Sequence, residues 1–184
     1  MKLIAEFKYN CNYIINKTAF LFHQEQMGRT FLINEKSFHI KLPNIYFVLI
    51  GHFTKDEERL GYYDSYLFGS VDRVEKLYDL VFPMPLPHVY DDGGVCLSHG
   101  DPIRFYSKDQ LIEWGLNSLF FGKNTKIYIC DDMVQFICKY PIKDDSVILQ
   151  EIARQSPGLW KKIPPATKLG KCIDFCSENV ILNY

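Results

Sequence analysis

The sequence lacks a surplus of charge of either sign. Its 184 residues include 21 lysines and arginines and 22 aspartates and glutamates, so the formal net charge is −1. A protein that neutralises nucleic-acid phosphates usually carries a marked basic surplus or a basic stripe, and neither is visible in this chain. We therefore expect no nucleic-acid partner.

Long apolar runs are also missing. The longest run, "IYFVLIG", is much shorter than the roughly 20 residues that a membrane-spanning helix needs. Near the start, Glu6 and Lys8 interrupt the apolar residues, so no secretory signal is recognised. We expect a cytoplasmic protein without a membrane partner, in which the six cysteines are reduced thiols.

The chain has no internal repeat, no low-complexity tract and no long linker, which favours a single domain over residues 1–184. The hydrophobic fraction of 47% is typical of a packed globular protein, and the aromatic fraction of 15% favours strands. We predict a strand-rich part (1–82), a loop (83–106) and a mainly helical part (107–184). This is an α+β pattern with segregated elements.

Period-two alternation predicts a strand at the start, in "KLIAEFKY" (2–9). The stretch "NIYFVLIGH" (44–52) is apolar on both faces, which predicts a central, buried strand. The spacing of the strands suggests an antiparallel meander. For residues 73–82 the pattern leaves a short helix and a strand open. Further strands are predicted at 18–24, 29–34, 37–42 and 62–69.

The clearest predicted helix covers residues 107–122. Ser107 and Gln110 form a capping-box pattern at its start, Gly122 can end it, and Trp114 is expected to pack it on the sheet. Residues 125–140 are interpreted as a hairpin turning at Asp131 and Asp132, with a helix in their second half as the alternative. Two further helices are predicted at 144–156 and 168–182.

The loop "PMPLPHVYDDGGVCLSHG" (83–100) holds one cysteine behind strong turn chemistry. Residues 91–94, Asp-Asp-Gly-Gly, favour a sharp turn that leaves Cys96 at its lip, near the surface. His88 and His99 can approach the sulfur when the segment folds back, and a cationic imidazole lowers a thiol pKa. The ordinary alternative is that Cys96 is a small buried hydrophobic residue.

The loop resembles the active-site loop of ubiquitin-conjugating enzymes. In that family a His-Pro-Asn triplet is followed, eight residues after the Asn, by a cysteine within Ile-Cys-Leu or Val-Cys-Leu. Here Leu86-Pro87-His88 occupies the triplet and Val95-Cys96-Leu97 the cysteine site, with Gly93 three residues before the cysteine. "PLPHVYDDGGVC" is most similar to prokaryotic ubiquitin-conjugating-like proteins, including the B proteins of PRTRC cassettes. The likeness covers residues 83–97, and His88 and Leu86 depart from the triplet.

This resemblance implies a ubiquitin-conjugating-like fold, with a strand meander followed by the active-site loop and helices. It also implies that Cys96 accepts a ubiquitin-like protein from an activating enzyme of the ThiF-like type. The ubiquitin-like protein then passes from the thioester to an amine of a target. The resemblance further implies that the partners are encoded nearby in a bacterial operon or mobile element, in antiviral defence or in a plasmid-linked cassette. No cofactor is implied.

Thioester transfer needs an oxyanion donor and an acceptor for the amine's proton. By the resemblance, His88 takes the place of the family's Asn as donor. The candidate acceptors or positioning groups are Asp91, Asp92, Asp101 and His99.

Three other readings of the loop stay open. A cysteine hydrolase would use Cys96 with His88 or His99 as base. A zinc site would combine His88, Cys96 and His99 with Cys130 or Cys138, although this spacing is not a usual zinc pattern. A non-catalytic module would bind a ubiquitin-like protein without transferring it.

Overall fold

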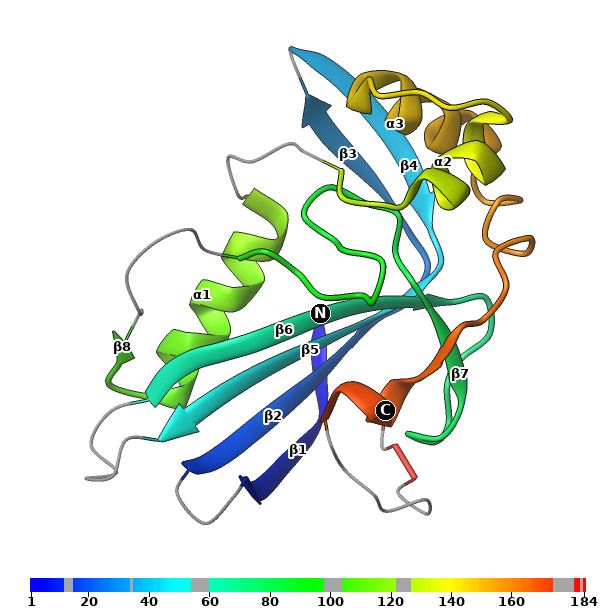
Figure 1. The fold of residues 1–184 in the computed structure, drawn as a ribbon. Coiled ribbons are helices and arrows are strands. Elements are labelled where there is room, and N and C mark those ends of the chain that lie inside the picture. Colours follow the sequence, from blue (N-terminus) through cyan, green and yellow to red (C-terminus); the bar gives the residue numbers. More distant parts are fainter. Residues whose placement is uncertain are drawn as a thin grey trace.

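The predicted α+β class is confirmed. The computed structural model describes residues 1–11, 15–33, 35–53, 60–97, 104–121, 127–173, 181–182 and 184. Within these ranges the chain forms a curled antiparallel sheet and three α-helices, and most strands precede the helices (Figure 1). None of the helices in the described ranges is long and apolar enough to cross a membrane.

The main sheet is antiparallel throughout, and its central strand is buried as predicted. That strand is β5 (Asn44–Phe53), whose residues 45–49 are at most 1% exposed. Alternate β5 side chains enter two different hydrophobic clusters, one on each face of the sheet. The spatial order is β1 (Lys2–Cys11), β2 (Ile15–Gln24), β5, β6 (Leu60–Ser70), β7 (Leu80–Pro83) and β9 (Thr167–Lys168), while β8 (Arg104–Phe105) pairs with the start of β6.

The predicted meander is only partly right, because two strands leave the main sheet. β3 (Met27–Ile33) and β4 (Lys36–Leu42) form a separate two-stranded hairpin, and β2 pairs with β5 across this insertion. The buried β4 side chains, Phe38, Ile40 and Leu42, belong to the larger hydrophobic cluster. Alternation in a strand predicts which side chains are buried, but it does not say which strand is the neighbour.

Helix α1 (Lys108–Phe121) starts where the capping pattern predicts. The Ser107 hydroxyl accepts a hydrogen bond from the backbone N–H of Gln110 at 3.3 Å. The Gln110 side chain accepts in turn from the N–H of Tyr106 at 2.9 Å. These bonds satisfy amide donors that have no partner inside the helix. The predicted end at Gly122 lies outside the described residues.

Two neighbouring residues of α1, Trp114 and Gly115, fix the helix on the sheet. Gly115 faces the buried Leu49 of β5 so closely that an added Cβ would lie 2.8 Å from the leucine side chain. Trp114 packs beside the ring of Tyr62 in β6, with the ring centroids 5.0 Å apart, and it also contacts Phe105. The prediction that Trp114 packs this helix on the sheet is confirmed.

The hairpin predicted over residues 125–140 is wrong, and the alternative of a helix in its second half is right. Helix α2 (Asp131–Cys138) has Asp131 and Asp132 in its first turn, where carboxylates stabilise the positive end of the helix dipole. Val134, Ile137 and Cys138 form its buried stripe. The double aspartate therefore starts a helix rather than forming a turn between strands.

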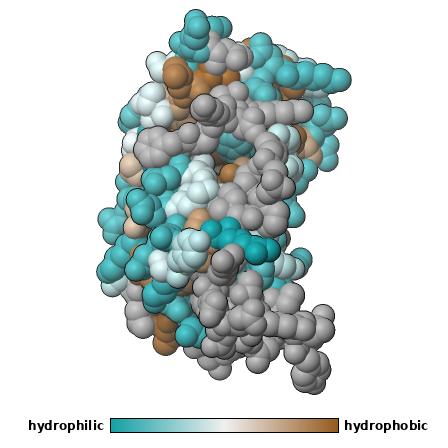
Figure 2. All heavy atoms as spheres, turned by 90° about the vertical axis from the view of Figure 1, so that its left-hand side faces the viewer, coloured by the Kyte–Doolittle hydropathy of each residue, from teal (hydrophilic) through white to brown (hydrophobic). Residues whose placement is uncertain are grey.

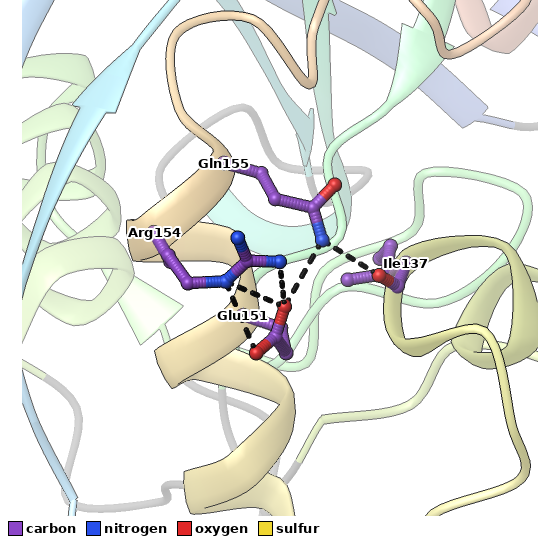
Figure 3. Close-up of polar contacts among 4 residues, drawn as sticks. All are labelled: Ile137, Glu151, Arg154 and Gln155. Atoms are coloured by element: carbon purple, nitrogen blue, oxygen red, sulfur yellow. Dashed lines mark hydrogen bonds and ion pairs between the residues drawn. The ribbon is translucent and has the colours of Figure 1, made fainter.

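The predicted helix at 144–156 is confirmed as α3 (Asp145–Gln155). Figure 3 shows how polar side chains connect it to α2: the Gln155 amide donates to the backbone carbonyl of Ile137 at 2.7 Å. The same amide contacts the Glu151 carboxylate, which Arg154 also binds at 2.7 Å. The two helices pack together, and α3 also packs against β4.

The C-terminal part is less helical than predicted. Over 168–182 the described structure is a 3-10 helix, η1 (Leu169–Ile173), and residues 174–180 lie outside the described ranges. In the undecided stretch 73–82, a turn leads into β7. Trp160 anchors this region, because its indole N–H donates to the carbonyl of Lys41 and its ring stacks on Phe82.

Candidate active site around Cys96

The turn predicted at residues 91–94 is confirmed and is closed by three hydrogen bonds. The Gly93 N–H donates to the Tyr90 carbonyl at 2.9 Å, and the Tyr90 N–H donates to the Gly94 carbonyl at 2.8 Å. The Asp92 carboxylate accepts from the Gly94 N–H at 2.8 Å. Gly93 has a φ of +88°, and an added Cβ would lie 2.3 Å from the ring of Phe68. This position therefore requires glycine.

The segment folds back so that the backbones of Cys96 and His88 lie side by side. Val89 and Val95 form an antiparallel bridge, and the Cys96 N–H donates to the His88 carbonyl at 2.9 Å. His88 has a φ of +69°, a conformation in which histidine is enriched among non-glycine residues. Its side chain is buried, whereas Cys96 is partly buried.

One side of this hairpin is attached to the main sheet. The Leu67 N–H donates to the Gly93 carbonyl, and the Val95 N–H donates to the Ser65 carbonyl, both at 2.8 Å. Tyr66 and Gly94 form an antiparallel bridge. Residues 93–95 thus extend the sheet at the middle of β6.

The other side of the hairpin is held by the segment before α2. Tyr90 bridges to Tyr128, and the centroids of their rings are 4.8 Å apart. The Asp91 carboxylate accepts from the N–H of Cys130 at 2.6 Å, at the start of α2. In Figure 1 the loop, in bright green, lies between α1 and the pair formed by α2 and α3. Asp91 and Asp92 both therefore shape the loop.

Two tyrosine side chains lie near the Cys96 sulfur. The side chains of Tyr90 and Cys96 are close enough to interact electrostatically. Partial burial raises the pKa of Tyr90, and the nearby Cys96 and Asp92 side chains raise it further. Burial raises the pKa of Tyr62 to about 12, and the nearby charges of Asp64 and Cys96 contribute to this rise. Both phenols are protonated near neutral pH and can donate hydrogen bonds.

Sequence reasoning missed both tyrosines, although a signal for Tyr90 was present. In a hairpin that pairs Val89 with Val95, the period-two rule places Tyr90 on the same face as Cys96, as a diagonal neighbour. Tyr62 carries no such local signal, because it reaches the site from β6, more than thirty residues earlier in the chain.

Only some of the remaining residues considered for the site are described by the structure. His99 and Asp101 lie outside the described residues, as do the side chains of Cys11, Cys172 and Cys176. Cys130 is exposed, and Cys138 is buried in the core. In the ranges that the structure describes, no three His, Cys, Asp or Glu side chains form a group that could hold a metal ion.

Figure 2 shows the side of the molecule that lies on the left in Figure 1, where α1 and β8 are found. Where residues are described, this face is mostly hydrophilic, and its hydrophobic patches are small and separate.

Comparison of the chain with protein-family models, with curated proteins and with solved structures finds no match. The site is therefore defined by its own geometry, as a partly buried thiol that ends a hairpin held on both sides.

Proposed function

We propose that this protein is a ubiquitin-conjugating-like transferase, which carries a ubiquitin-like protein as a thioester on Cys96 and passes it to an amine. The observation that carries the proposal is the hairpin that presents Cys96: Val89 pairs with Val95, and the Cys96 N–H is bonded to the His88 carbonyl. A nucleophilic thiol has to be reachable and stabilised as a thiolate. Cys96 is partly buried, and Tyr90 is 41% exposed beside it.

In the first step, the Cys96 thiolate attacks the carbonyl carbon of the thioester that joins the ubiquitin-like protein to its activating enzyme. A new carbon–sulfur bond forms to Cys96 through a tetrahedral oxyanion. The bond to the activating enzyme's cysteine then breaks, and that sulfur leaves as a thiolate. A donor near the oxyanion is typically worth about 2.7–4 kcal/mol in such reactions.

In the second step, an amine attacks the same carbonyl carbon, and the Cys96 thiolate leaves. An amide bond replaces the thioester, and the amine loses one proton to an acceptor. The Tyr90 hydroxyl is the candidate donor to the leaving sulfur, because the exposed Tyr90 side chain lies near Cys96. The Asp92 carboxylate is exposed on the same turn and is the described candidate acceptor. Asp101 and His99 stay predictions for the same role.

His88 is the candidate oxyanion donor that the resemblance implies. Its backbone is fixed next to Cys96 by the bond from the Cys96 N–H to the His88 carbonyl. Histidine donates from a ring nitrogen only in the appropriate tautomer or charge state. Oxyanion stabilisation by His88 would therefore depend on pH, unlike stabilisation by an asparagine amide.

The proposal includes the fold and the partners. A strand-rich first part, a hairpin loop that contains the cysteine and helices that follow it are the order expected of a ubiquitin-conjugating-like fold. The partners are an activating enzyme of the ThiF-like type and a ubiquitin-like protein, and the cytoplasm is the expected compartment.

The test needs no known partner. The full chain is incubated with a short synthetic peptide that carries a C-terminal thioester, and acylated residues are located by mass spectrometry. We expect Cys96 to be acylated at least about tenfold faster than Cys130, because an oriented nucleophile reacts faster than a merely exposed one. Dithiothreitol should cleave this adduct, and added free lysine should convert it to an amide.

Cys96→Ala and Cys130→Ser are the matched variants, and only the first should abolish the adduct. Release of the peptide as a free acid, in the presence of lysine, would contradict transfer and favour a cysteine hydrolase. If Cys96 is acylated no faster than Cys130, a nucleophilic role of Cys96 is contradicted. The non-catalytic module that binds a ubiquitin-like protein is then the interpretation that remains.

A further inference from the structure

Ser65 is a fully buried polar residue in the middle of β6, and it contacts both polar backbone groups of Val95. The Val95 N–H donates to the Ser65 carbonyl at 2.8 Å, and the Ser65 hydroxyl donates to the Val95 carbonyl at 3.2 Å. Ser65 is 0% exposed. Because Val95 directly precedes Cys96, these two bonds fix the backbone from which the thiol projects.

Tyr62 extends this contact by one hydrogen bond. Its hydroxyl oxygen lies 3.0 Å from the Ser65 hydroxyl oxygen. Since the only hydroxyl hydrogen of Ser65 is directed at Val95, Tyr62 is the donor in this pair. The result is a chain of hydrogen bonds from Tyr62 through Ser65 to the Val95 carbonyl. The Tyr62 ring is itself held against Trp114 of α1.

The cost of burying polar groups indicates that these hydroxyls have a role other than stabilising the fold. A buried hydroxyl destabilises the fold when it lacks a partner and gains little over an apolar side chain when it has one. Serine at a fully buried strand position therefore adds little stability. What it adds is a bond to one particular carbonyl, next to Cys96.

We propose that Tyr62 and Ser65 are positioning residues for Cys96, which hold the backbone of Val95 and with it the end of the loop from which the thiol projects. This inference rests on the proposed function, since it assigns the two residues to the same thioester chemistry. Neither residue has to touch the acyl group. Tyr62 and Ser65 act through Val95, from the side of the sheet.

The test compares Ser65→Ala and Tyr62→Phe with Tyr66→Phe. The control variant removes a 2.7 Å bond from Tyr66 to Asp64 on the same strand, but Tyr66 packs into the cluster on the other face of the sheet. For each protein, the alkylation rate of Cys96 is measured from about pH 6 to pH 10. Urea unfolding and acylation by the peptide thioester are measured in parallel.

We expect both test variants to change the alkylation profile of Cys96, because a loosened thiol no longer keeps its place beside the Tyr90 side chain. We expect acylation at saturating pH to slow by roughly tenfold to a hundredfold, the range for a misplaced reacting group. Tyr66→Phe should leave both readouts unchanged. Ser65→Thr keeps the hydroxyl and should restore the profile that Ser65→Ala loses.

The positioning role is overturned if Ser65→Ala and Tyr62→Phe unfold more easily but keep the wild-type pH profile and acylation rate. If Ser65→Ala does not fold, Tyr62→Phe alone decides, because its ring packing is retained. If the wild-type protein is not acylated at all, the proposed function fails, and the alkylation profiles still test the positioning of the thiol.

Discussion

At the scale of single residues, the three cysteines with described side chains occupy three different environments. Cys96 is partly buried and lies near Tyr90, while Cys130 is exposed at the start of α2. Burial raises the pKa of Cys138, and the Glu151 charge raises it further. A thiol in an apolar setting is rarely a thiolate and reacts slowly. Comparisons among these three thiols therefore separate reactivity that comes from exposure from reactivity that comes from orientation.

His23 is the second residue whose environment has a measurable consequence. It is 5% exposed, it contacts Asn44 through its Nε2 atom at 3.3 Å, and its ring meets the edge of Tyr184. Burial lowers the pKa of His23, the bond to Asn44 opposes this, and the positive charge of Arg73 lowers it further. The folded protein therefore binds a proton at His23 less readily than the unfolded chain does.

We expect the free energy of unfolding to be highest above about pH 6.5, the ordinary histidine value, and to fall as the pH decreases through and below it. The sign follows because the unfolded state takes up the proton first. Urea unfolding at several pH values measures this. In His23→Gln the free energy of unfolding should depend less steeply on pH. Some dependence should remain from His52, because burial also lowers the pKa of His52. His39→Gln, an exposed position, is the control. Equal slopes for all three proteins would contradict the assignment.

At the scale of the elements, the hairpin that contains Cys96 depends on one glycine. Gly93 and Gly94 are adjacent, but only Gly93 has a positive φ, and only its added Cβ would meet the buried ring of Phe68. At Gly94 the nearest atom is the carboxylate oxygen of Asp92, an exposed side chain that can move away. The two glycines are thus a natural test and control.

We predict that Gly93→Ala destabilises the protein by more than the about 1–2 kcal/mol that the left-handed conformation alone costs a residue with a Cβ. The clash with Phe68 adds to this cost. Gly94→Ala should cost less than about 1 kcal/mol. Urea unfolding measures both, and alkylation of Cys96 shows whether the turn keeps the thiol in place. A smaller loss for Gly93→Ala than for Gly94→Ala would contradict the role of Gly93.

At the scale of the whole molecule, the sheet separates two hydrophobic clusters, and the β3–β4 hairpin projects from it. β5 is hydrogen-bonded on both sides, to β2 and to β6. The hairpin has hydrogen-bonded strands of its own and packs against α3 (Figure 1). Local opening is easiest where backbone bonds are least surrounded by other strands.

Native-state hydrogen exchange should therefore be slowest in β5 and faster in β3. The measurement is amide exchange followed by mass spectrometry of peptides that cover each strand. The loop residues Val95 and Cys96 should exchange slowly for a loop, because their N–H groups are bonded to Ser65 and His88. Exchange in β3 as slow as in β5 would show that the hairpin and the sheet open as one unit.

Local patterns were enough to predict several parts of this protein. The apolar run at 44–52 predicted the buried β5, the Ser107–Gln110 pattern predicted the start of α1, and the Asp-Asp-Gly-Gly turn predicted the hairpin that leads to Cys96. Each of these follows from interactions within one element. Their physical causes, namely burial of alternating or continuous apolar residues, capping of free amides and positive φ at glycine, act over a few residues.

The tertiary structure decided what depends on distant segments. β2 pairs with β5 rather than β3, and residues 131–138 are a helix whose apolar stripe is buried beside α3. The surroundings of the Cys96 sulfur likewise combine the loop with Tyr62 and Ser65 of β6. Such contacts join positions that are far apart in the chain, and their stability comes from the burial that the complete fold provides. Sequence by itself determined that a thiol ends a tight turn, and only the fold determined which side chains surround it.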